Sequence, residues 1–260
     1  MDLALKHPLA FVPTMGALHA GHQSLIELAR TKSTNVLVSI FVNPLQFENP
    51  EDLAKYPRDL AGDIAKAESA GATFVWSPEV EEIYPADPQI IPAGELGNKF
   101  EGVHRFGHFD GVLTVVKRLF DLTNPEIAVF GEKDFQQLFL IKRMVKEFEL
   151  PIQIINAPII REPDGLAMSS RNVRLDFDGR SAATIISAAL TEGAREKSVT
   201  KARAKIQKVL AQEESFALDY AEIIDEETFE LATDETNLPR ALIAGWIGGV
   251  RLIDNMAVCR

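Results

Sequence analysis

Residues 9–22 read LAFVPTMGALHAGH, and this stretch decides how the first half of the chain folds. Its first five residues are a short apolar run, which predicts a buried strand. The segment at 13–22 follows directly and carries Gly16 and Gly21, after which an amphipathic pattern predicts a helix over 22–32. A strand that turns into a helix in this way is the building unit of an α/β sheet.

The alternation of strand and helix continues to residue 156. Short apolar, β-branched runs predict four more strands, at 36–42, 73–76, 127–130 and 152–156. Amphipathic segments between them predict helices at 59–70, 111–121 and 134–148. The expected fold class is therefore α/β, with a Rossmann-like parallel sheet and helices on both faces. Two long segments, 43–57 and 84–107, are polar or rich in proline and glycine and predict ligand-holding loops.

The second half of the chain has a different pattern. Residues 162–165 read EPDG, a strong turn signal. The elements predicted after this turn are helices at 179–197 and 200–212 and strands at 220–224 and in two runs between 241 and 254. Gly248 and Gly249 interrupt the last two runs. We therefore expect two domains, 1–160 with the parallel sheet and 161–260 as a smaller α+β C-terminal domain.

The composition excludes several classes of protein. The chain has 260 residues, of which 46% are hydrophobic and 25% charged, as in folded globular proteins. It carries 27 Lys plus Arg against 38 Asp plus Glu, a net charge of −11, which argues against a nucleic-acid partner. The sequence has neither a membrane-length apolar run nor a signal-like start, and a single Cys259 allows no internal disulfide or cysteine-based metal site. We expect a cytoplasmic protein with no membrane partner.

The segment at 13–22 is the first candidate binding site. A helix N-terminus carries a partial positive charge and N–H groups that bind phosphate. His19 and His22 add two donors three residues apart, which can converge on one anion. The pattern is neither a dinucleotide-binding G-x-G-x-x-G motif nor a Walker loop. A purely structural role of the two histidines is the alternative, although the first strand-to-helix junction of an α/β sheet favours binding.

Two further segments carry groups suited to phosphate. Residues 131–137, GEKDFQQ, also lie between a strand and a helix, and Lys133 can pair with phosphate oxygens. Residues 168–172, MSSRN, combine two hydroxyls with a guanidinium, an oxyanion clamp suited to a pyrophosphate leaving group at a flexible position between domains. The alternatives are an Asp134 helix cap beside a solvated Lys133, and a serine-capped helix start beside a surface arginine.

Residues 41–47, FVNPLQF, follow the second predicted strand. Asn43 and Gln46 place amide groups beside aromatic rings, a mixture suited to a small, hydroxylated and partly aliphatic acid. A turn with a buried glutamine is the alternative. Residues 102–111, GVHRFGHFDG, precede the helix at 111–121 and can serve either substrate positioning or loop folding.

Together these motifs resemble the pantothenate synthetase family, the ATP-dependent ligases of pantoate and β-alanine. The matching segments extend over nearly the whole chain, at 13–22, 41–47, 131–137, 164–172 and 251–255. The element His19-x-x-His22 resembles the signature of the class I nucleotidyltransferase superfamily, and residues 168–171 resemble its second, KMSKS-type loop. Phe106 stands where the family usually has proline, and Ile160 stands where valine is more usual.

The resemblance implies a two-step reaction. Pantoate attacks the α-phosphate of ATP to give pantoyl adenylate and pyrophosphate, and β-alanine then displaces AMP. It further implies Mg²⁺ held mainly by phosphate and water oxygens, with no protein ligand assigned, and a homodimer. In this scheme the 1–160 domain binds nucleotide and pantoate, and the 161–260 domain closes over the site.

The resemblance also assigns roles to individual residues. His22 is the proton donor, and His19 is its phosphate-facing partner. The catalytic groups are His22, His19, Lys133, Ser169, Ser170 and Arg171. The nucleotide contacts are Met15, Gly16, Ala17, Leu18, His19, Ala20, Gly21, His22, Gly131, Glu132, Lys133, Asp134, Ile160, Met168, Ser169, Ser170 and Arg171. The substrate contacts are Gln46, Asn43 and Gln137, of which Gln46 touches both pantoate and β-alanine.

Three other functions compete with this interpretation. A nucleotidylyltransferase would attach AMP or CMP to a phosphorylated substrate and stop, and would lack the acid pocket of Asn43 and Gln46. A tRNA-charging enzyme is disfavoured by the net charge of −11 and the short length. A nucleotide sensor without turnover would not require His22, Lys133 and Arg171.

Overall fold

The computed structural model describes residues 5–47, 50–54 and 56–259. The chain forms two compact units. The first comprises Met1–Glu132 and Gln136–Pro158, and the second comprises Lys133–Phe135 and Ile159–Arg260, as far as these residues are described. Each unit has its own sheet and its own hydrophobic core.

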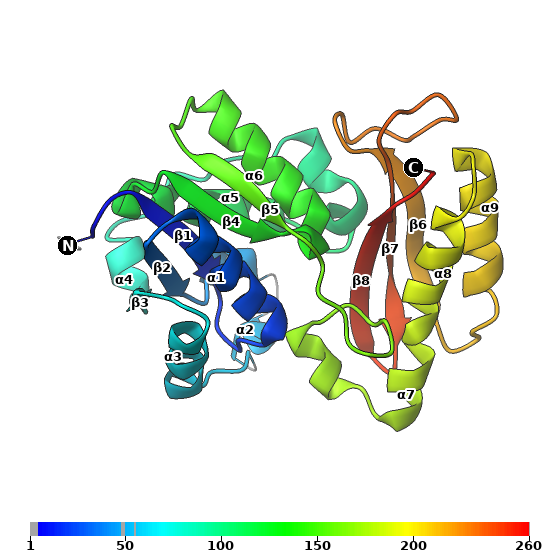
Figure 1. The fold of residues 1–260 in the computed structure, drawn as a ribbon, viewed down its shortest axis with the longest axis horizontal. Helices are drawn as coiled ribbons and strands as arrows, with labels where there is room; N and C mark the ends of the chain where they lie inside the picture. The colour runs from blue at the N-terminus through cyan, green and yellow to red at the C-terminus, as the bar shows by residue number, and fades with distance from the viewer. Residues whose placement is uncertain (1–4, 48–49, 55, 260) are drawn as a thin grey trace. The chain divides into compact units, whose positions relative to one another are not determined.

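The first unit is built on a parallel five-stranded sheet in the order β3-β2-β1-β4-β5 (Figure 1). Its strands are β1 Leu9–Thr14, β2 Asn35–Ile40, β3 Phe74–Trp76, β4 Ile127–Gly131 and β5 Gln153–Ala157. All five predicted strands are present, and the expected parallel sheet is confirmed. The run at 36–42 extends two residues beyond the end of β2 at Ile40.

Helices cover both faces of this sheet because successive residues of a strand point to opposite faces. Ala10 of β1 shares a buried cluster with Ile26, which lies on α1 (Ala20–Lys32). Its neighbour Phe11 contacts Phe120 of α5 (His108–Thr123), with 6.3 Å between the ring centroids. The predicted α/β class is therefore confirmed.

The remaining helices described in this part of the chain span three to five residues, except for two longer ones, α3 Leu60–Ser69 and α6 Phe135–Glu147. The short helices are η1 Pro44–Gln46, α2 Pro50–Ala54, α4 Val80–Ile83, η2 Glu95–Asn98, η3 Phe100–Val103 and η4 Glu132–Asp134. The segments 43–57 and 84–107 are therefore not simple loops, although residues 48, 49 and 55 lie outside the described residues. Helices of three to five residues are too short to produce a hydrophobic period.

The second unit has an antiparallel sheet in the order β6-β7-β8. Its strands are β6 Ala217–Asp225, β7 Pro239–Ile247 and β8 Val250–Ala257. Gly248 and Gly249, with φ of 55° and 74°, join β7 to β8 at the predicted interruption. Two consecutive residues with positive φ suit a tight hairpin whose twist matches that of its strands.

Helices α8 (Thr184–Ala194) and α9 (Val199–Leu210) pack on this sheet and share its core. The expectation of one helix over 179–197 is wrong, because α7 (Phe177–Ala182) and α8 are separate helices. The break is a change in hydrogen bonding at Ala183, whose φ and ψ of −61° and −21° stay in the helical region. Nothing in the composition marks such a break.

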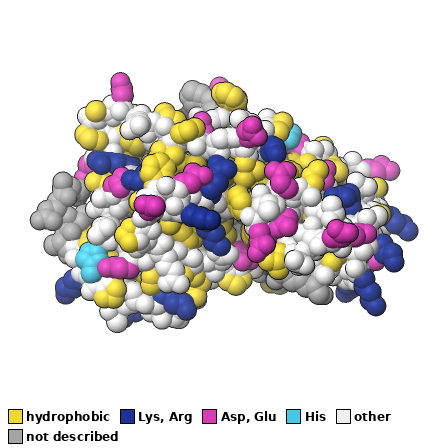
Figure 2. All heavy atoms as spheres, turned by 90° about the horizontal axis from the view of Figure 1, so that it is seen from above, with side chains coloured by type: hydrophobic (Ala, Val, Ile, Leu, Met, Phe, Trp, Pro, Cys, Tyr) yellow, Lys and Arg dark blue, Asp and Glu magenta, His cyan; other side chains and the backbone are white. Residues whose placement is uncertain are grey.

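On the face drawn in Figure 2, acidic and basic side chains are interspersed with apolar ones. Within the described ranges, no helix is both long enough and apolar enough to cross a bilayer.

Candidate active site

The loop after β1 turns sharply into α1. Gly16 and Ala17 have positive φ, 83° and 51°, and a Cβ on Gly16 would lie 2.9 Å from Oδ2 of Asp63. The buried Asp63 carboxylate of α3 accepts hydrogen bonds from the N–H groups of Ala17 (2.8 Å) and Leu18 (2.7 Å). These two N–H groups therefore hold the loop. Sequence analysis missed Asp63 because a separation of about 45 residues leaves no local signal.

His19 and His22 form a reciprocal cap at the start of α1. Nδ1 of His19 accepts a hydrogen bond from the N–H of Gly21 (3.1 Å), and Nδ1 of His22 accepts one from the N–H of His19 (3.3 Å). Because Nδ1 is the acceptor in both rings, the neutral form of each ring carries its proton on Nε2. The ring centroids are 4.2 Å apart. The pair therefore has two neighbouring Nε2–H groups, while the cap occupies an N–H that a phosphate could otherwise use.

Asn43 is the centre of a buried hydrogen-bond cluster after β2. Its Nδ2 donates to Oε1 of Gln46 (3.2 Å) and to the carbonyl of Gly111 (3.0 Å). Its Oδ1 accepts from the N–H of Leu45 (3.3 Å) and from the hydroxyl of Tyr84 (3.0 Å). All four hydrogen-bonding positions of this amide thus have protein partners. The geometry indicates that Asn43 orients Gln46.

Gln46 links the loops that follow β1 and β2. Its Nε2 donates to Sδ of Met15 at 2.7 Å, and its backbone carbonyl lies 2.9 Å from Nδ1 of His108. A Cβ on Gly111 would come within 2.3 Å of the carbonyl oxygen of Leu45, so glycine is required there. The segment that leads into α5 therefore supports the Gln46 turn. No local pattern singles out His108, because its partner is 62 residues away.

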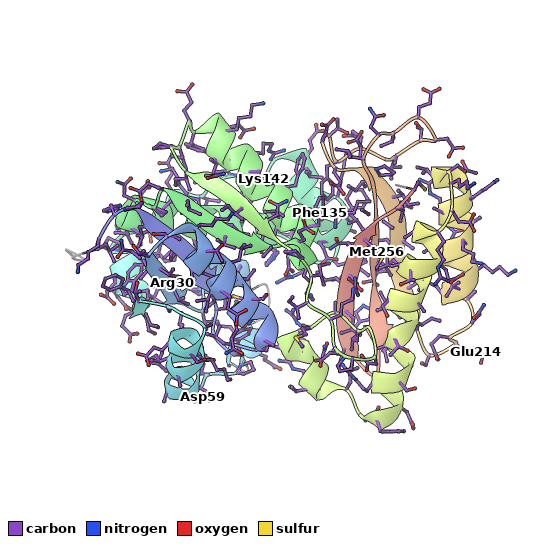
Figure 3. The ribbon with its side chains drawn as sticks, viewed as in Figure 1. Arg30, Asp59, Phe135, Lys142, Glu214 and Met256 are labelled. Atoms are coloured by element: carbon purple, nitrogen blue, oxygen red, sulfur yellow. The ribbon has the colours of Figure 1, made fainter. Side chains whose placement is uncertain are left out.

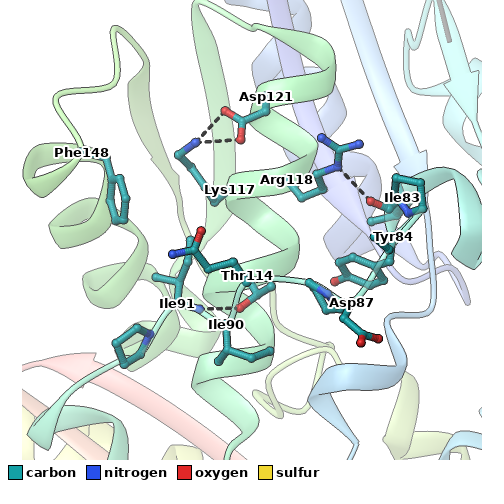
Figure 4. Close-up of a pocket in the computed structure, with 15 residues that line it drawn as sticks. Ile83, Tyr84, Asp87, Ile90, Ile91, Thr114, Lys117, Arg118, Asp121 and Phe148 are labelled. Carbon is teal, nitrogen blue, oxygen red and sulfur yellow. Dashed lines mark hydrogen bonds and ion pairs between the residues drawn. The ribbon is translucent and has the colours of Figure 1, made fainter.

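Tyr84 lies between this cluster and a separate cavity. Burial raises the pKa of its hydroxyl, so the group stays protonated and donates to Asn43. The cavity, of about 450 Å³, lies between the segment at 83–92 and α5 (Figure 4). In its wall, Nε of Arg118 donates to the carbonyl of Ile83 at 2.9 Å. None of the residues to which the sequence assigns a role lines this cavity.

The two glutamines in the first turn of α6 have different environments. Gln136 is buried, its Oε1 accepts from the N–H of Glu101 (3.1 Å), and its Nε2 donates to the carbonyls of Leu96 (2.8 Å) and Lys99 (2.9 Å). It therefore anchors η2 and η3, a role that the sequence did not indicate. Gln137 is half-buried, and its amide has no hydrogen-bond partner among the residues that the structure describes. Of the two, Gln137 is the one with an amide available to a ligand.

In the second unit, Ser169 caps the short helix η5 (Ser170–Arg174). Its Oγ accepts from the N–H of Arg171 at 3.3 Å, and its hydroxyl hydrogen can still donate. The N–H of Met168 donates to the carbonyl of Ile160 at 2.9 Å, which closes the hairpin before η5. In the described part of the chain, neither the Ser170 hydroxyl nor the Arg171 guanidinium has a hydrogen-bond partner. The serine-capped start is thus present beside two groups that can bind an anion.

The segment from β4 to α6 holds the remaining candidates. Gly131 ends β4, and Glu132, Lys133 and Asp134 form η4. The carbonyl of Lys133 accepts a hydrogen bond from Nδ2 of Asn255 at 3.0 Å. Across the described ranges, no group of three or more His, Cys, Asp or Glu side chains could hold a metal ion.

Comparison with known proteins establishes the family. The model of the family described as Pantoate-beta-alanine ligase matches residues 2–257. The chain belongs to the pantoate-β-alanine ligase family. It is 49% identical over 262 residues to the pantothenate synthetase of Acidothermus cellulolyticus, and the alignment covers 97% of this chain and 86% of that protein. This family assignment confirms the resemblance seen in the motifs and makes the chain a ligase.

Two solved structures are also similar to this chain. A pantothenate synthetase from Thermus thermophilus has a TM-score of 0.91 at 42% identity, covering 95% of this chain and 92% of that one. A pantoate-β-alanine ligase from Francisella tularensis, solved in complex with β-γ ATP and β-alanine, has a TM-score of 0.78 at 38% identity, covering 99% and 91%. The Rossmann-like sheet followed by a smaller domain is therefore the fold of the family.

The Asp63 carboxylate provides a test of the loop geometry. We expect Asp63→Asn to lower the free energy of unfolding by about 1–3 kcal/mol, because an amide has a single acceptor oxygen and would turn its NH₂ toward a backbone N–H. Urea unfolding followed by circular dichroism measures this. Asp59→Asn at the exposed cap of the same helix is the matched control, since asparagine caps helices equally well. Equal stability of the two variants would contradict the role given to Asp63.

Proposed function

We propose that this ligase uses ATP to activate pantoate before the amide forms. A carboxylate oxygen of pantoate attacks the α-phosphorus of ATP, and the bond to pyrophosphate breaks, which leaves pantoyl adenylate. The neutral amine of β-alanine then attacks the acyl carbon, the bond to AMP breaks, and the amine nitrogen releases one proton to solvent. Activation is required because a carboxylate is a poor electrophile. The β-γ ATP and β-alanine named for the Francisella tularensis relative support these substrates.

The adjacent imidazoles of His19 and His22 are the observation that carries the proposal. Two Nε2–H donors with 4.2 Å between ring centroids can bind neighbouring phosphate oxygens. They stabilise the negative charge that moves onto the phosphate chain as the bond to pyrophosphate breaks. His22 donates a hydrogen bond from Nε2–H to the departing pyrophosphate oxygen, and His19 faces the phosphate chain beside it. No covalent enzyme intermediate is needed, so positioning and charge stabilisation supply the catalysis.

The second unit contributes the other groups that bind the phosphates. Lys133 and Arg171 supply positive charge, and the hydroxyls of Ser169 and Ser170 supply donors. The proposal thus requires ATP contacts from both units, with the 161–260 domain closing over the nucleotide. The further nucleotide contacts are Met15, Gly16, Ala17, Leu18, Ala20, Gly21, Gly131, Glu132, Asp134, Ile160 and Met168. For Ala17 and Leu18 these contacts exclude the N–H groups, which Asp63 occupies.

Pantoate binds to amide groups of the first unit. Gln46 and Gln137 hydrogen-bond the substrate, and Gln46 also reaches β-alanine. Asn43 acts by fixing Gln46, because its own hydrogen bonds go to protein groups. Neutral amides can bind both the hydroxyls and the carboxylate of pantoate without adding charge to a site that already holds a triphosphate.

Magnesium enters this scheme as part of the nucleotide substrate. The ion is held mainly by phosphate and water oxygens, and no protein ligand is assigned to it. The enzyme works in the cytoplasm.

Two copies of the chain form a homodimer. Light scattering on the purified protein should therefore give twice the mass of one chain. A mass equal to that of one chain at micromolar concentration would refute this.

The reaction type is tested by following both products. With pantoate and MgATP but no amine, we expect about one pyrophosphate per site and then a stop, because the adenylate stays bound. AMP should appear continuously only when β-alanine is added, and more slowly with glycine or γ-aminobutyrate. Labelled nucleotide retained in the final product would identify a nucleotidylyltransferase instead. Nucleotide binding without either product would identify a sensor.

The role of Lys133 is tested by Lys133→Ala. Loss of its positive charge from the transition state should cost about 3 kcal/mol, or roughly a hundredfold in rate. Steady-state AMP release measures the effect. Lys142→Ala, an exposed lysine on α6 labelled in Figure 3, is the control and should keep the rate of the unchanged protein. A Lys133→Ala rate within twofold of that control would overturn the assignment.

A further inference from the structure

The phosphate-binding loop at Lys133 is packed within the C-terminal unit, although it lies between β4 and α6 in sequence. Phe135, which follows the loop and is labelled in Figure 3, is buried. Its ring stacks on that of Phe229, with centroids 6.1 Å apart and planes inclined by 23°. The guanidinium of Arg240 lies 4.2 Å from the centroid of the Phe135 ring. These contacts fix one end of the loop but do not reach Lys133 itself.

Asn255 of β8 makes the contact that reaches Lys133. Its side chain is buried, and its Nδ2 donates to the Lys133 carbonyl at 3.0 Å. Its Oδ1 accepts from Nη1 of Arg240 at 2.6 Å, and Nε of Arg240 donates to Glu226 at 2.9 Å. Arginine is only a donor, so Arg240 forces the amide oxygen of Asn255 toward itself and the amide NH₂ toward Lys133. The orientation of the Asn255 donor is thereby determined.

The preceding residue, Asp254, holds a second segment of the same unit. Its buried carboxylate accepts from Nη1 (2.6 Å) and Nη2 (3.0 Å) of Arg161, and from the N–H of Asn255 (2.8 Å). Arg161 also donates to the carbonyl of Gly165, in the turn of the hairpin that leads to Ser169. Asn255 therefore contacts the loop at Lys133, and Asp254 contacts, through Arg161, the hairpin that leads to Ser169.

We propose that Asn255 is a positioning residue of the ligase, which holds the Lys133 backbone so that the ammonium is presented to the triphosphate of ATP. The inference rests on the proposed role of Lys133. It assigns a function to the 251–255 motif, which the family resemblance left without one. A positioned lysine loses less conformational freedom when ATP binds, and charge fixed before the reaction stabilises the transition state better than charge that must be brought into place.

Asn255→Asp removes the contact. The variant has the same shape and keeps an oxygen for Arg240, but it has no donor for the Lys133 carbonyl. We expect kcat/KM for ATP to fall tenfold or more, while KM for β-alanine changes less than twofold. Asn255→Ala, which adds no charge, should likewise lower kcat/KM for ATP and leave KM for β-alanine nearly unchanged. Asp219→Asn is the matched control, because it weakens the Arg251 to Asp219 pair (2.7 Å) of the same sheet.

A double-mutant cycle with Lys133→Ala decides whether Asn255 acts through the lysine. In a Lys133→Ala background, Asn255→Asp should have less than a twofold further effect on kcat/KM for ATP. If Lys133→Ala strongly lowers kcat/KM for ATP and the addition of Asn255→Asp lowers it a further tenfold, Asn255 acts by another route and the inference fails. If Lys133→Ala itself has no effect, the proposed role of the lysine fails instead.

Folding is the remaining control. Circular dichroism and thermal unfolding should show that Asn255→Asp and Asn255→Ala are folded at the assay temperature, as Asp219→Asn is. Unfolding of both Asn255 variants beside a folded control would overturn the inference, because the side chain would then determine the fold rather than the loop. A kcat/KM for ATP in the Asn255 variants equal to that of Asp219→Asn would overturn the inference as well.

Discussion

The structure of the first unit depends on one buried carboxylate. Asp63 accepts hydrogen bonds from two consecutive N–H groups, those of Ala17 and Leu18, and so holds the chain in the left-handed turn that begins at Gly16. A buried carboxyl group needs polar partners to replace its lost hydration, and the two N–H groups provide them here. The turn determines where α1 begins, and the start of α1 determines where the two imidazoles lie.

A chain of hydrogen bonds then joins the loops of neighbouring strands. Tyr84 donates to Asn43, Asn43 donates to Gln46, and Gln46 donates to the sulfur of Met15. Since β1 and β2 are adjacent in the sheet, the loops that follow them are adjacent as well. A change at any member would therefore move both the predicted acid pocket and the loop that leads to His19.

Much of the fold was predictable from sequence because its causes are local. Apolar runs marked all five parallel strands, and paired glycines marked the hairpin between β7 and β8. The spacing of His19 and His22 predicted two neighbouring donors, although not the cap that selects their tautomers. The partners of the site residues were not predictable, because Asp63, His108 and Gln136 act across 35 to 62 residues of sequence. Such pairings are decided by tertiary packing, which leaves no period in the sequence.

The path of the chain limits how this protein can be divided. Because Lys133–Phe135 belongs to the C-terminal unit, the backbone passes from one unit to the other three times rather than once. A fragment that ended at Pro158 would carry the Phe135 ring without its stacking partner, and a fragment that began at Ile159 would lack three residues of its own unit, among them the buried Phe135. Neither unit is therefore one continuous stretch of the chain. A chimaera made by exchanging C-terminal domains would have to exchange Lys133–Phe135 as well.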